Sequence, residues 1–344
     1  MCVDSNRRVR RCGAVVIVAC LPFLFPVSTV AQERASSAPE PEVVSFSSGA
    51  LTLGGVLYKP EGSGPFPVLI YNHGSAPGMW NNKAFEQIGP LFIDRDWVFF
   101  APYRRGQGLS ASAGPFILDE IARAQKERAR RDLPITMFII VALLVFLYFI
   151  TRSRRVWLRV ISAVTVVAAV AGVSYASYVN AGATAMVELL ETDHLDDHLA
   201  ALDWLKAQSF IQPNQIATGG NSFGGIVAVL GAERTRYCAA VDAAGGASSW
   251  SMAPQLRTRM MQAVRNSQSP ILFFQAANDY TLAPSRTLSE EMLSAGKTTE
   301  IIIYPAFGKS AAQGHSFAWR GSSVWIADVF QFLHEHCVAD QNEE

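Results

Sequence analysis

The sequence predicts a doubly wound α/β fold with a mainly parallel sheet and an inserted transmembrane helical hairpin. Short apolar runs, among them "FPVLIYNHG", "VFFAPYRRG" and "PILFFQAAN", alternate with stretches of helical length, as is typical of buried parallel strands. Two longer runs, 133–151 and 160–186, interrupt this pattern because they contain no charged residue. Each is long enough to cross a bilayer as a helix.

These patterns divide the chain into four parts. Residues 1–31 are expected to be a signal peptide or N-terminal anchor, and 133–186 the hairpin. The flanking segments, 32–132 and 187–344, are expected to form one α/β domain, whose size suits a single core. A β-hairpin over 43–60 opens this domain.

The first segment has the arrangement of a secretory signal. Four arginines between positions 7 and 11 precede the apolar stretch "GAVVIVACLPFLFPV", and the small residues Thr29 and Ala31 follow it. An uncleaved anchor and a lipoprotein signal ending at Cys20 are the alternatives. All three predict an exported protein at the cell membrane, with its catalytic domain on the periplasmic or extracellular side.

The predicted hairpin has a basic turn. Arg152, Arg154, Arg155 and Arg159 lie between the two apolar runs, and the positive-inside rule places such a loop in the cytoplasm. The hairpin therefore predicts a lipid bilayer as a partner of 133–186. Small residues at 168 and 172, Ala168 and Gly172, predict close approach of the two helices.

Composition and cysteine content narrow the other possibilities. The 344 residues include 29 basic and 29 acidic ones, so no net charge attracts nucleic acid, and no nucleic-acid partner is expected. Only Cys238 and Cys337 lie outside the N-terminal segment. In an exported domain they either pair or remain two buried thiols, and their spacing does not decide which.

The segment "IATGGNSFGG" predicts a nucleophile at the end of a strand. Ser222 lies between Gly220 and Gly224, and a helical stretch follows directly. A hydroxyl presented on a tight turn from strand to helix requires small neighbours two residues away on either side, because other backbone passes close there. A serine also needs a base and a group that orients the base.

Two later strands supply those groups. Asp279 ends "FFQAAND", and His315 follows the next strand through a loop. The order Ser222, Asp279, His315 matches the α/β-hydrolase arrangement, with Asp242 as the alternative acid. For the oxyanion we expect the backbone N–H of Phe223 and a second N–H from Ser75 or Gly74. His73, beside them, is expected to shape the loop rather than act as a base.

The segments "NHGS", "YRRGQGLS", "GNSFGG", "AANDY" and "GHSF", in this order, resemble the dienelactone hydrolase branch of the α/β-hydrolases. That branch in turn resembles the prolyl oligopeptidase catalytic domain. The resemblance covers about 43–118 and 187–337, and it implies a serine hydrolase without metal or organic cofactor. Two features depart from it. The named dienelactone enzymes have a cysteine where this chain has Ser222, and such domains do not usually carry a membrane hairpin.

Other residues allow two interpretations each. His194 and His198 have a zinc-compatible spacing, but a hydrated helix start is favoured, and no metal is expected. Arg104 or Arg105 either meets a substrate carboxylate or makes an internal ion pair. In the segment 245–268, Trp250, Met252, Met260 and Met261 either line an acyl pocket or pack a cap helix.

Together these patterns predict a membrane-tethered serine hydrolase that cleaves carboxylic esters through an acyl-enzyme. The insertion leaves the chain after the carboxyl end of one parallel strand and returns before the next helix, so both its ends lie on the active-site side. The hairpin should therefore direct the catalytic mouth towards the bilayer. A prolyl oligopeptidase-type peptidase, acting on peptide substrates, is the alternative enzyme. A non-catalytic membrane binding protein with a hydrolase fold is the alternative from another class.

Overall fold

The computed structural model describes residues 40–75, 83–152 and 155–338. The predicted signal or anchor, 1–31, lies outside the described residues. Residues 38–344 belong to one compact unit, which holds the predicted domain together with the hairpin. All contacts discussed below lie within this unit.

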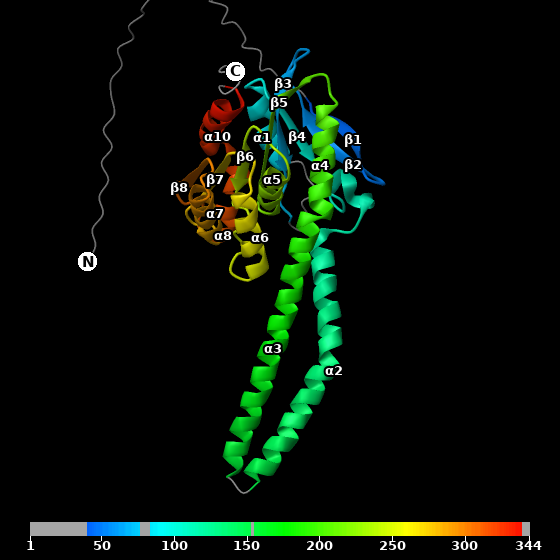
Figure 1. Ribbon diagram of the computed structural model, residues 1–344, viewed down its shortest axis with the longest axis vertical. Helices are drawn as coiled ribbons and strands as arrows, with labels where there is room; N and C mark the ends of the chain where they lie inside the picture. The colour runs from blue at the N-terminus through cyan, green and yellow to red at the C-terminus, as the bar shows by residue number, and fades with distance from the viewer. Residues whose placement is uncertain (1–39, 76–82, 153–154, 339–344) are drawn as a thin grey trace, which may run out of the picture. The chain divides into compact units, whose positions relative to one another are not determined.

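An eight-stranded sheet forms the centre of the domain (Figure 1). Its strands are β1 (Glu42–Ser48), β2 (Leu51–Tyr58), β3 (Phe66–Asn72), β4 (Val98–Pro102), β5 (Ile211–Asn221), β6 (Ala240–Ala243), β7 (Ile271–Ala276) and β8 (Thr299–Tyr304). The spatial order is β1-β2-β4-β3-β5-β6-β7-β8. Only the β1–β2 and β2–β4 pairings are antiparallel, so the predicted opening hairpin and mainly parallel sheet are confirmed.

Helices cover both faces of this sheet. Their bounds are α1 (Lys83–Ile93), α4 (Asp193–Lys206), α5 (Phe223–Arg234), α6 (Pro254–Arg265), α7 (Ala283–Ser294), α8 (Ala311–His315), α9 (Phe317–Arg320) and α10 (Ser322–Cys337), with a 3-10 helix η1 (Gly108–Ala113) after β4. Helices α1, α9 and α10 pack on one another, and so does the series α4, α5, α6, α7. Each group buries a continuous apolar cluster, which makes the fold doubly wound.

A disulfide joins Cys238 to Cys337. Cys238 lies just before β6, and Cys337 is the last residue of α10. The bond therefore ties the C-terminal helix to the amino end of a central strand, across 99 residues of sequence. The sequence allows either a disulfide or two buried thiols, and the structure has the disulfide.

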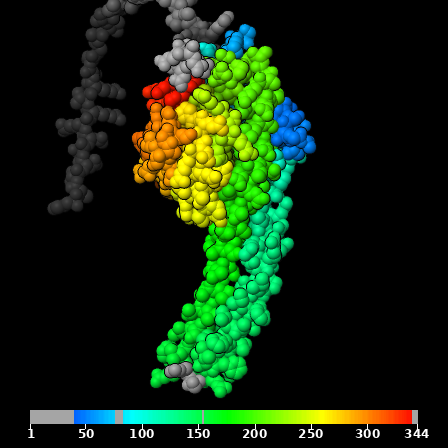
Figure 2. All heavy atoms as spheres, viewed as in Figure 1, coloured from blue at the N-terminus to red at the C-terminus, as the bar shows by residue number. Residues whose placement is uncertain are grey.

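The hairpin is longer than the predicted 133–186. Helix α2 spans Ile117–Thr151 and α3 spans Val156–Glu191, and the two pack along each other (Figure 1). The charged segment before residue 133 continues the helix, supported by Glu120–Arg123 and Arg128–Asp132 ion pairs at helical spacing. Both helices are long and apolar enough to cross a membrane by length and composition, and their most apolar windows are 0% buried. Figure 2 shows their surfaces uncovered by the domain over most of their length.

Polar contacts set the register of α2 against α3. Ser177 donates to Asp132 Oδ2 at 2.7 Å, and the hydroxyls of Thr136 and Ser174 lie 3.1 Å apart. The expectation that Gly172 lies at the helix contact is wrong, because a Cβ there would meet only open space. The close approach is instead at Gly182, where a Cβ would collide with the side chain of Gln125.

Removal of the disulfide should destabilise the domain without changing its fold. For Cys238→Ser combined with Cys337→Ser, we expect the free energy of unfolding to fall by about 2–5 kcal/mol, because a cross-link over a long loop restricts the unfolded chain. Chemical denaturation with and without reductant measures this. Reductant should lower the midpoint of the wild-type protein alone, and an equal response of the double variant would contradict the assignment.

Candidate active site

Ser222 lies in a tight turn between β5 and α5. β5 ends at Asn221 and α5 begins at Phe223, so Ser222 alone makes the turn, with φ 55° and ψ −119°. This backbone conformation is rare for a residue with a side chain and is typical of functional sites. A Cβ at Gly220 or at Gly224 would collide with the carbonyl of Asn72 at the end of β3. The spacing of the two glycines thus has the steric reason inferred from the sequence.

The loop after β3 lies directly over the nucleophile. A Cβ at Gly74 would come within 3.4 Å of the Ser222 Cβ. The side chain of Asn221 holds this loop, because its Oδ1 accepts from the Tyr71 hydroxyl and from the Gly74 N–H, both at 3.0 Å. The Gly74 N–H is therefore already used inside the protein. This leaves the Ser75 N–H as the better candidate for a second oxyanion donor.

Phe223 supplies the first candidate donor. It is the first residue of α5, and N–H groups in the first turn of a helix have no acceptor within the helix. The same end of the helix also carries a partial positive charge, which favours a developing oxyanion. Phe223 itself is buried, so its N–H is held within packed structure.

Arg104 holds the loop after β3, which contains Gly74 and Ser75, by hydrogen bonds. Its guanidinium is 2% exposed and donates to the carbonyl of His73 at 2.6 Å and to the Ser75 hydroxyl at 2.7 Å. Burial lowers the pKa of Arg104 to about 10, which still leaves it charged at neutral pH. Burial, with the Arg104 charge second, also holds the pKa of His73 well below its ordinary value. The His73 Nδ1 lies 2.7 Å from the carbonyl of Gly74, which agrees with a loop-shaping role.

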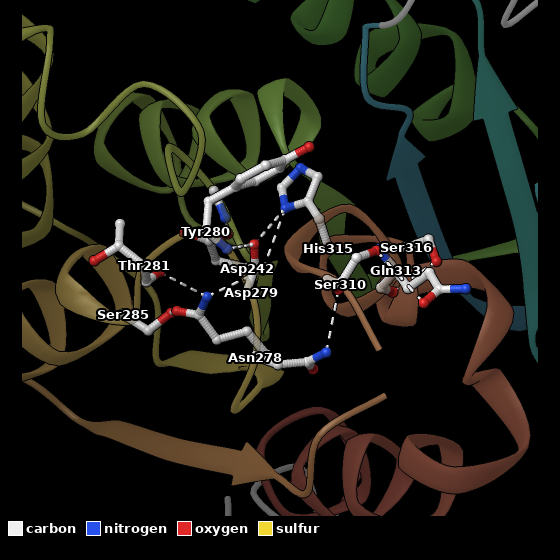
Figure 3. Close-up of polar contacts among 12 residues, drawn as sticks. Asp242, Asn278, Asp279, Tyr280, Thr281, Ser285, Ser310, Gln313, His315 and Ser316 are labelled. Atoms are coloured by element: carbon white, nitrogen blue, oxygen red, sulfur yellow. Dashed lines mark hydrogen bonds and ion pairs between the residues drawn. The ribbon is translucent and has the colours of Figure 1, made fainter. Parts of the chain in front are cut away.

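Asp279 and His315 form a hydrogen-bonded pair at the neighbouring strand ends (Figure 3). Asp279 follows β7 and His315 ends α8, after β8. The His315 Nδ1 lies 2.9 Å from Asp279 Oδ1 and 3.2 Å from Oδ2. With Nδ1 directed to the carboxylate, Nε2 is the ring nitrogen free to accept a proton. The ring of Tyr280, half-exposed, lies beside the imidazole with 5.2 Å between ring centroids.

Further polar residues, which the sequence did not single out, hold this pair in place. Gln275 on β7 donates to Asp279 Oδ2 at 3.1 Å, and Ser285 in turn donates to Gln275 at 2.7 Å. Asn278 donates to the carbonyls of Phe307 and Ser310, which fixes the loop that leads to His315 (Figure 3). In the sequence, the only indication of these supporting residues is that polar side chains gather at the end of a predicted strand, in "FFQAANDY".

Asp242, the alternative acid, has a different environment. It is the third residue of β6, is 1% exposed, and accepts one hydrogen bond, from the Gly245 N–H at 2.7 Å. Its Oδ2 has no partner among the described residues. Burial raises the pKa of Asp242 to about 7, so at neutral pH this carboxyl is only about half ionised, which makes it a weaker partner for an imidazole that gains charge.

Among the described residues, no hydrogen bond joins the Ser222 hydroxyl to His315. The structure therefore brings acid and base together, and it places the nucleophile on the same edge of the sheet, after β5. Catalytic hydrogen bonds of this kind are often long without substrate and tighten when it binds. The arrangement can perform nucleophilic attack assisted by a base, with two backbone N–H groups available to the oxyanion.

The remaining candidates make contacts within the domain. The expected hydrated helix start at His194 and His198 is wrong, because both side chains are buried. His198 Nε2 lies 2.7 Å from the Tyr237 hydroxyl, and in the described part of the chain no cluster of three metal-ligating side chains includes His194 or His198. Arg105 binds Asp197 through two nitrogens, at 2.9 and 2.7 Å, and also Asp193. Trp250 and Met260 are buried in the cluster beneath α6, Met261 packs against it partly buried, and Met252 is exposed. These three pack the cap helix, as the second interpretation expected.

Comparisons with known proteins identify the family and the fold of this chain. The model of the dienelactone hydrolase family matches residues 165–337. No curated protein matches the sequence significantly. Solved structures that resemble this chain have sequence identities of 16% or less, so they show its fold alone.

Three solved structures illustrate the α/β-hydrolase fold of the domain. An acylaminoacyl peptidase from Pyrococcus horikoshii matches 87% of this chain with a TM-score of 0.54 at 16% identity, and the match spans 42% of the peptidase. A protein described as a dienelactone hydrolase from Klebsiella pneumoniae has a TM-score of 0.52 at 14% identity, over 87% of this chain and 98% of its own. The Pyrococcus furiosus esterase Pf2001 has a TM-score of 0.51 at 12% identity, covering 87% and 93%.

Replacement of the two acids should distinguish their roles. Asp242→Asn should retain most hydrolytic activity on p-nitrophenyl acetate, whereas Asp279→Asn should reduce kcat by about 10³ to 10⁴, because the imidazole loses its orienting partner. The reverse pattern would assign the acid to Asp242.

The difference in stability between Asp242→Asn and the wild-type protein should depend on pH. The folded protein keeps a proton on Asp242 up to about pH 7, whereas the unfolded chain releases it near the ordinary pKa of 3.8. The wild-type protein therefore loses stability as pH rises between these values, and Asp242→Asn does not. The stability of the variant relative to wild type should rise by on the order of 4 kcal/mol over that range. Denaturation at a series of pH values measures it, and a constant difference would contradict the buried, protonated carboxyl.

Proposed function

Because this chain belongs to the dienelactone hydrolase family, we propose that it is a serine hydrolase that cleaves carboxylic esters through Ser222, His315 and Asp279. The single observation that carries the proposal is the strained turn at Ser222 beside a hydrogen-bonded Asp279–His315 pair. A turn of this conformation is costly to maintain and exposes a hydroxyl at the edge where acid and base meet.

In the proposed reaction, His315 Nε2 removes the proton of the Ser222 hydroxyl as its oxygen attacks the ester carbonyl. Asp279 orients the imidazole and stabilises its charged form. The oxyanion is bound by the N–H groups of Phe223 and Ser75. The imidazolium then gives its proton to the leaving alkoxide, and an acyl-enzyme remains on Ser222. Water, activated by the same histidine, releases the acid and restores the serine.

We further propose that α2 and α3 hold the enzyme in a membrane. Support comes from two uncharged runs, each the length of a span, whose surfaces the domain does not cover. Both helices join the domain at the carboxyl edge of the parallel strands, after β4 and before α4, and Ser222 lies on that edge. This arrangement favours ester substrates with apolar acyl groups that partition into lipid.

The alternative enzyme is a peptidase of the prolyl oligopeptidase type, which acts on amides. The fold likeness to an acylaminoacyl peptidase is compatible with it. The match spans 42% of that protein, so a shared fold does not transfer its substrate. Amide and ester substrates with the same acyl group separate the two proposals directly.

Replacement of the nucleophile tests the catalytic proposal. Ser222→Ala should lower kcat on p-nitrophenyl butyrate by at least about 10³-fold and abolish labelling by a fluorophosphonate probe, because the attacking oxygen is lost. The matched control is Ser294→Ala, since Ser294 is exposed at the end of α7, away from the site, and has no assigned role. Folded wild-type protein that hydrolyses neither ester nor anilide and does not react with the probe would favour a non-catalytic binding protein.

Shortening of the hairpin tests the membrane proposal. Because Asp132 and Ser177 are in contact, residues 133–176 can be replaced by four glycines that join the two helices without separating them. In lipid vesicles, this variant should lose its attachment and its preference for dodecanoate over butyrate esters, while it still hydrolyses soluble butyrate. Unchanged flotation with the vesicles, or an unchanged preference for the long acyl chain, would contradict the proposal.

A further inference from the structure

The loop between β6 and α6, residues 244–253, is uncharged and largely buried, and its exposed residues are Ser248, Ser251 and Met252. No charged residue occurs from 243 to 256. Met252 is 61% exposed, while Trp250 is 7% exposed and anchors the loop in the core beneath α6. Arg257 donates to the carbonyl of Trp250 at 2.6 Å, which further restrains the loop. The loop therefore presents one apolar side chain, Met252, between small polar residues on a restrained backbone.

The beginning of α6 touches the hairpin near the start of its apolar part. Gln255, in the first turn of α6, donates to Asn180 on α3. Ser177, three residues before Asn180, is bonded to Asp132, the last charged residue before the uncharged run of α2. Three residues of helix correspond to about 4.5 Å along the axis. The first turn of α6 is thus within about one helical turn of the expected lipid boundary.

A second contact shows which way α6 runs along the hairpin. Arg259, four residues after Gln255, binds Glu191 at the end of α3 that joins the domain, at 2.6 Å. Progress along α6 from Gln255 to Arg259 therefore leads away from the hairpin tip. The loop that precedes α6, with Met252, must then lie on the side of Gln255 that faces the tip (Figure 1).

The same loop forms part of the rim of the active site. It begins after β6, which lies between β5 and β7, the strands that precede Ser222 and Asp279. The carbonyl of Ala243, just before the loop, accepts the Ser222 N–H at 3.0 Å. The loop therefore connects the surroundings of the nucleophile to the level of the expected lipid boundary.

We infer that the loop 244–253 rests in the interfacial region of the lipid bilayer, with Met252 inserted among the lipid chains. The inference rests on the proposed membrane-spanning hairpin and adds a second contact between the domain and the lipid. Charged residues of α2 between Ile117 and Asp132 extend over about 22 Å of helix, which by themselves would hold the site away from the bilayer. The loop spans this gap, so an amphiphilic ester can reach Ser222 from the lipid along an uncharged surface.

Photo-crosslinking in the full-length protein tests this contact. Three variants carry p-benzoylphenylalanine in place of Met252, Phe146 or Leu293, and each is placed in nanodiscs of phosphatidylglycerol and phosphatidylethanolamine. Phe146, 63% exposed on α2, reports on the span itself. Leu293 is the matched negative control, because it is also 63% exposed but lies one residue before the end of α7, near the amino end of β8 on the opposite edge of the sheet. A thermal unfolding transition like that of wild type verifies that each variant is folded.

Irradiation should attach lipid to the Phe146 and Met252 variants and not to the Leu293 variant, as measured by the mass of the intact protein. Lipid attachment at position 146 with no more at 252 than at 293 would overturn the loop contact and leave the membrane-spanning hairpin intact. Absence of attachment at 146 would overturn the hairpin proposal, and the loop inference with it. Ester hydrolysis by Ser222 does not depend on either result.

Discussion

The close packing of the turn at Ser222 against the end of β3 is the constraint on which the site depends. The carbonyl of Asn72 approaches so near to Gly220 and Gly224 that neither position has space for a Cβ. This contact forces the nucleophile into its unusual backbone conformation and brings the loop after β3 over the serine. Asn221 then completes the arrangement, since its side chain binds the Gly74 N–H of that loop. Nucleophile and candidate oxyanion donors are consequently positioned by one packed junction of two parallel strands.

The acid and the base form a second rigid unit on the same edge of the sheet. Gln275 orients the carboxylate of Asp279, and Asn278 fixes the loop that carries His315. These groups come from a strand end and the residues directly after it, so the position of the imidazole is set by the sheet rather than by a free loop. A network in which each polar group has a partner restricts motion more than isolated pairs do. The Ser222 turn follows β5, and Asp279 and His315 follow β7 and β8, with β6 between them, so the sheet sets the relative position of the two units.

The hairpin, inserted at this edge, is also linked to the packed helices of the domain. Its helices continue into the domain, where Arg259 connects Glu191 of α3 to Glu233 of α5, the helix that begins after the nucleophile. Half-buried ion pairs of this kind are more favourable when they form networks. The cap helix α6 is thus joined both to the hairpin and to the catalytic core. The orientation of the domain relative to the hairpin follows from these contacts and from the apolar packing at Met186 and Leu190.

The sequence by itself determined the elements that depend on local pattern. Alternating apolar runs predicted the parallel sheet and the opening hairpin, and glycine spacing predicted the turn at Ser222, because both follow from backbone geometry over a few residues. Only the tertiary structure placed Asp279 against His315, joined Cys238 to Cys337, committed the Gly74 N–H to Asn221, and moved the helix contact from Gly172 to Gly182. These outcomes depend on which distant groups become neighbours and on how deeply each is buried. Distances between strands and the loss of solvent around a carboxyl arise only when the sheet assembles, so no local pattern could contain them.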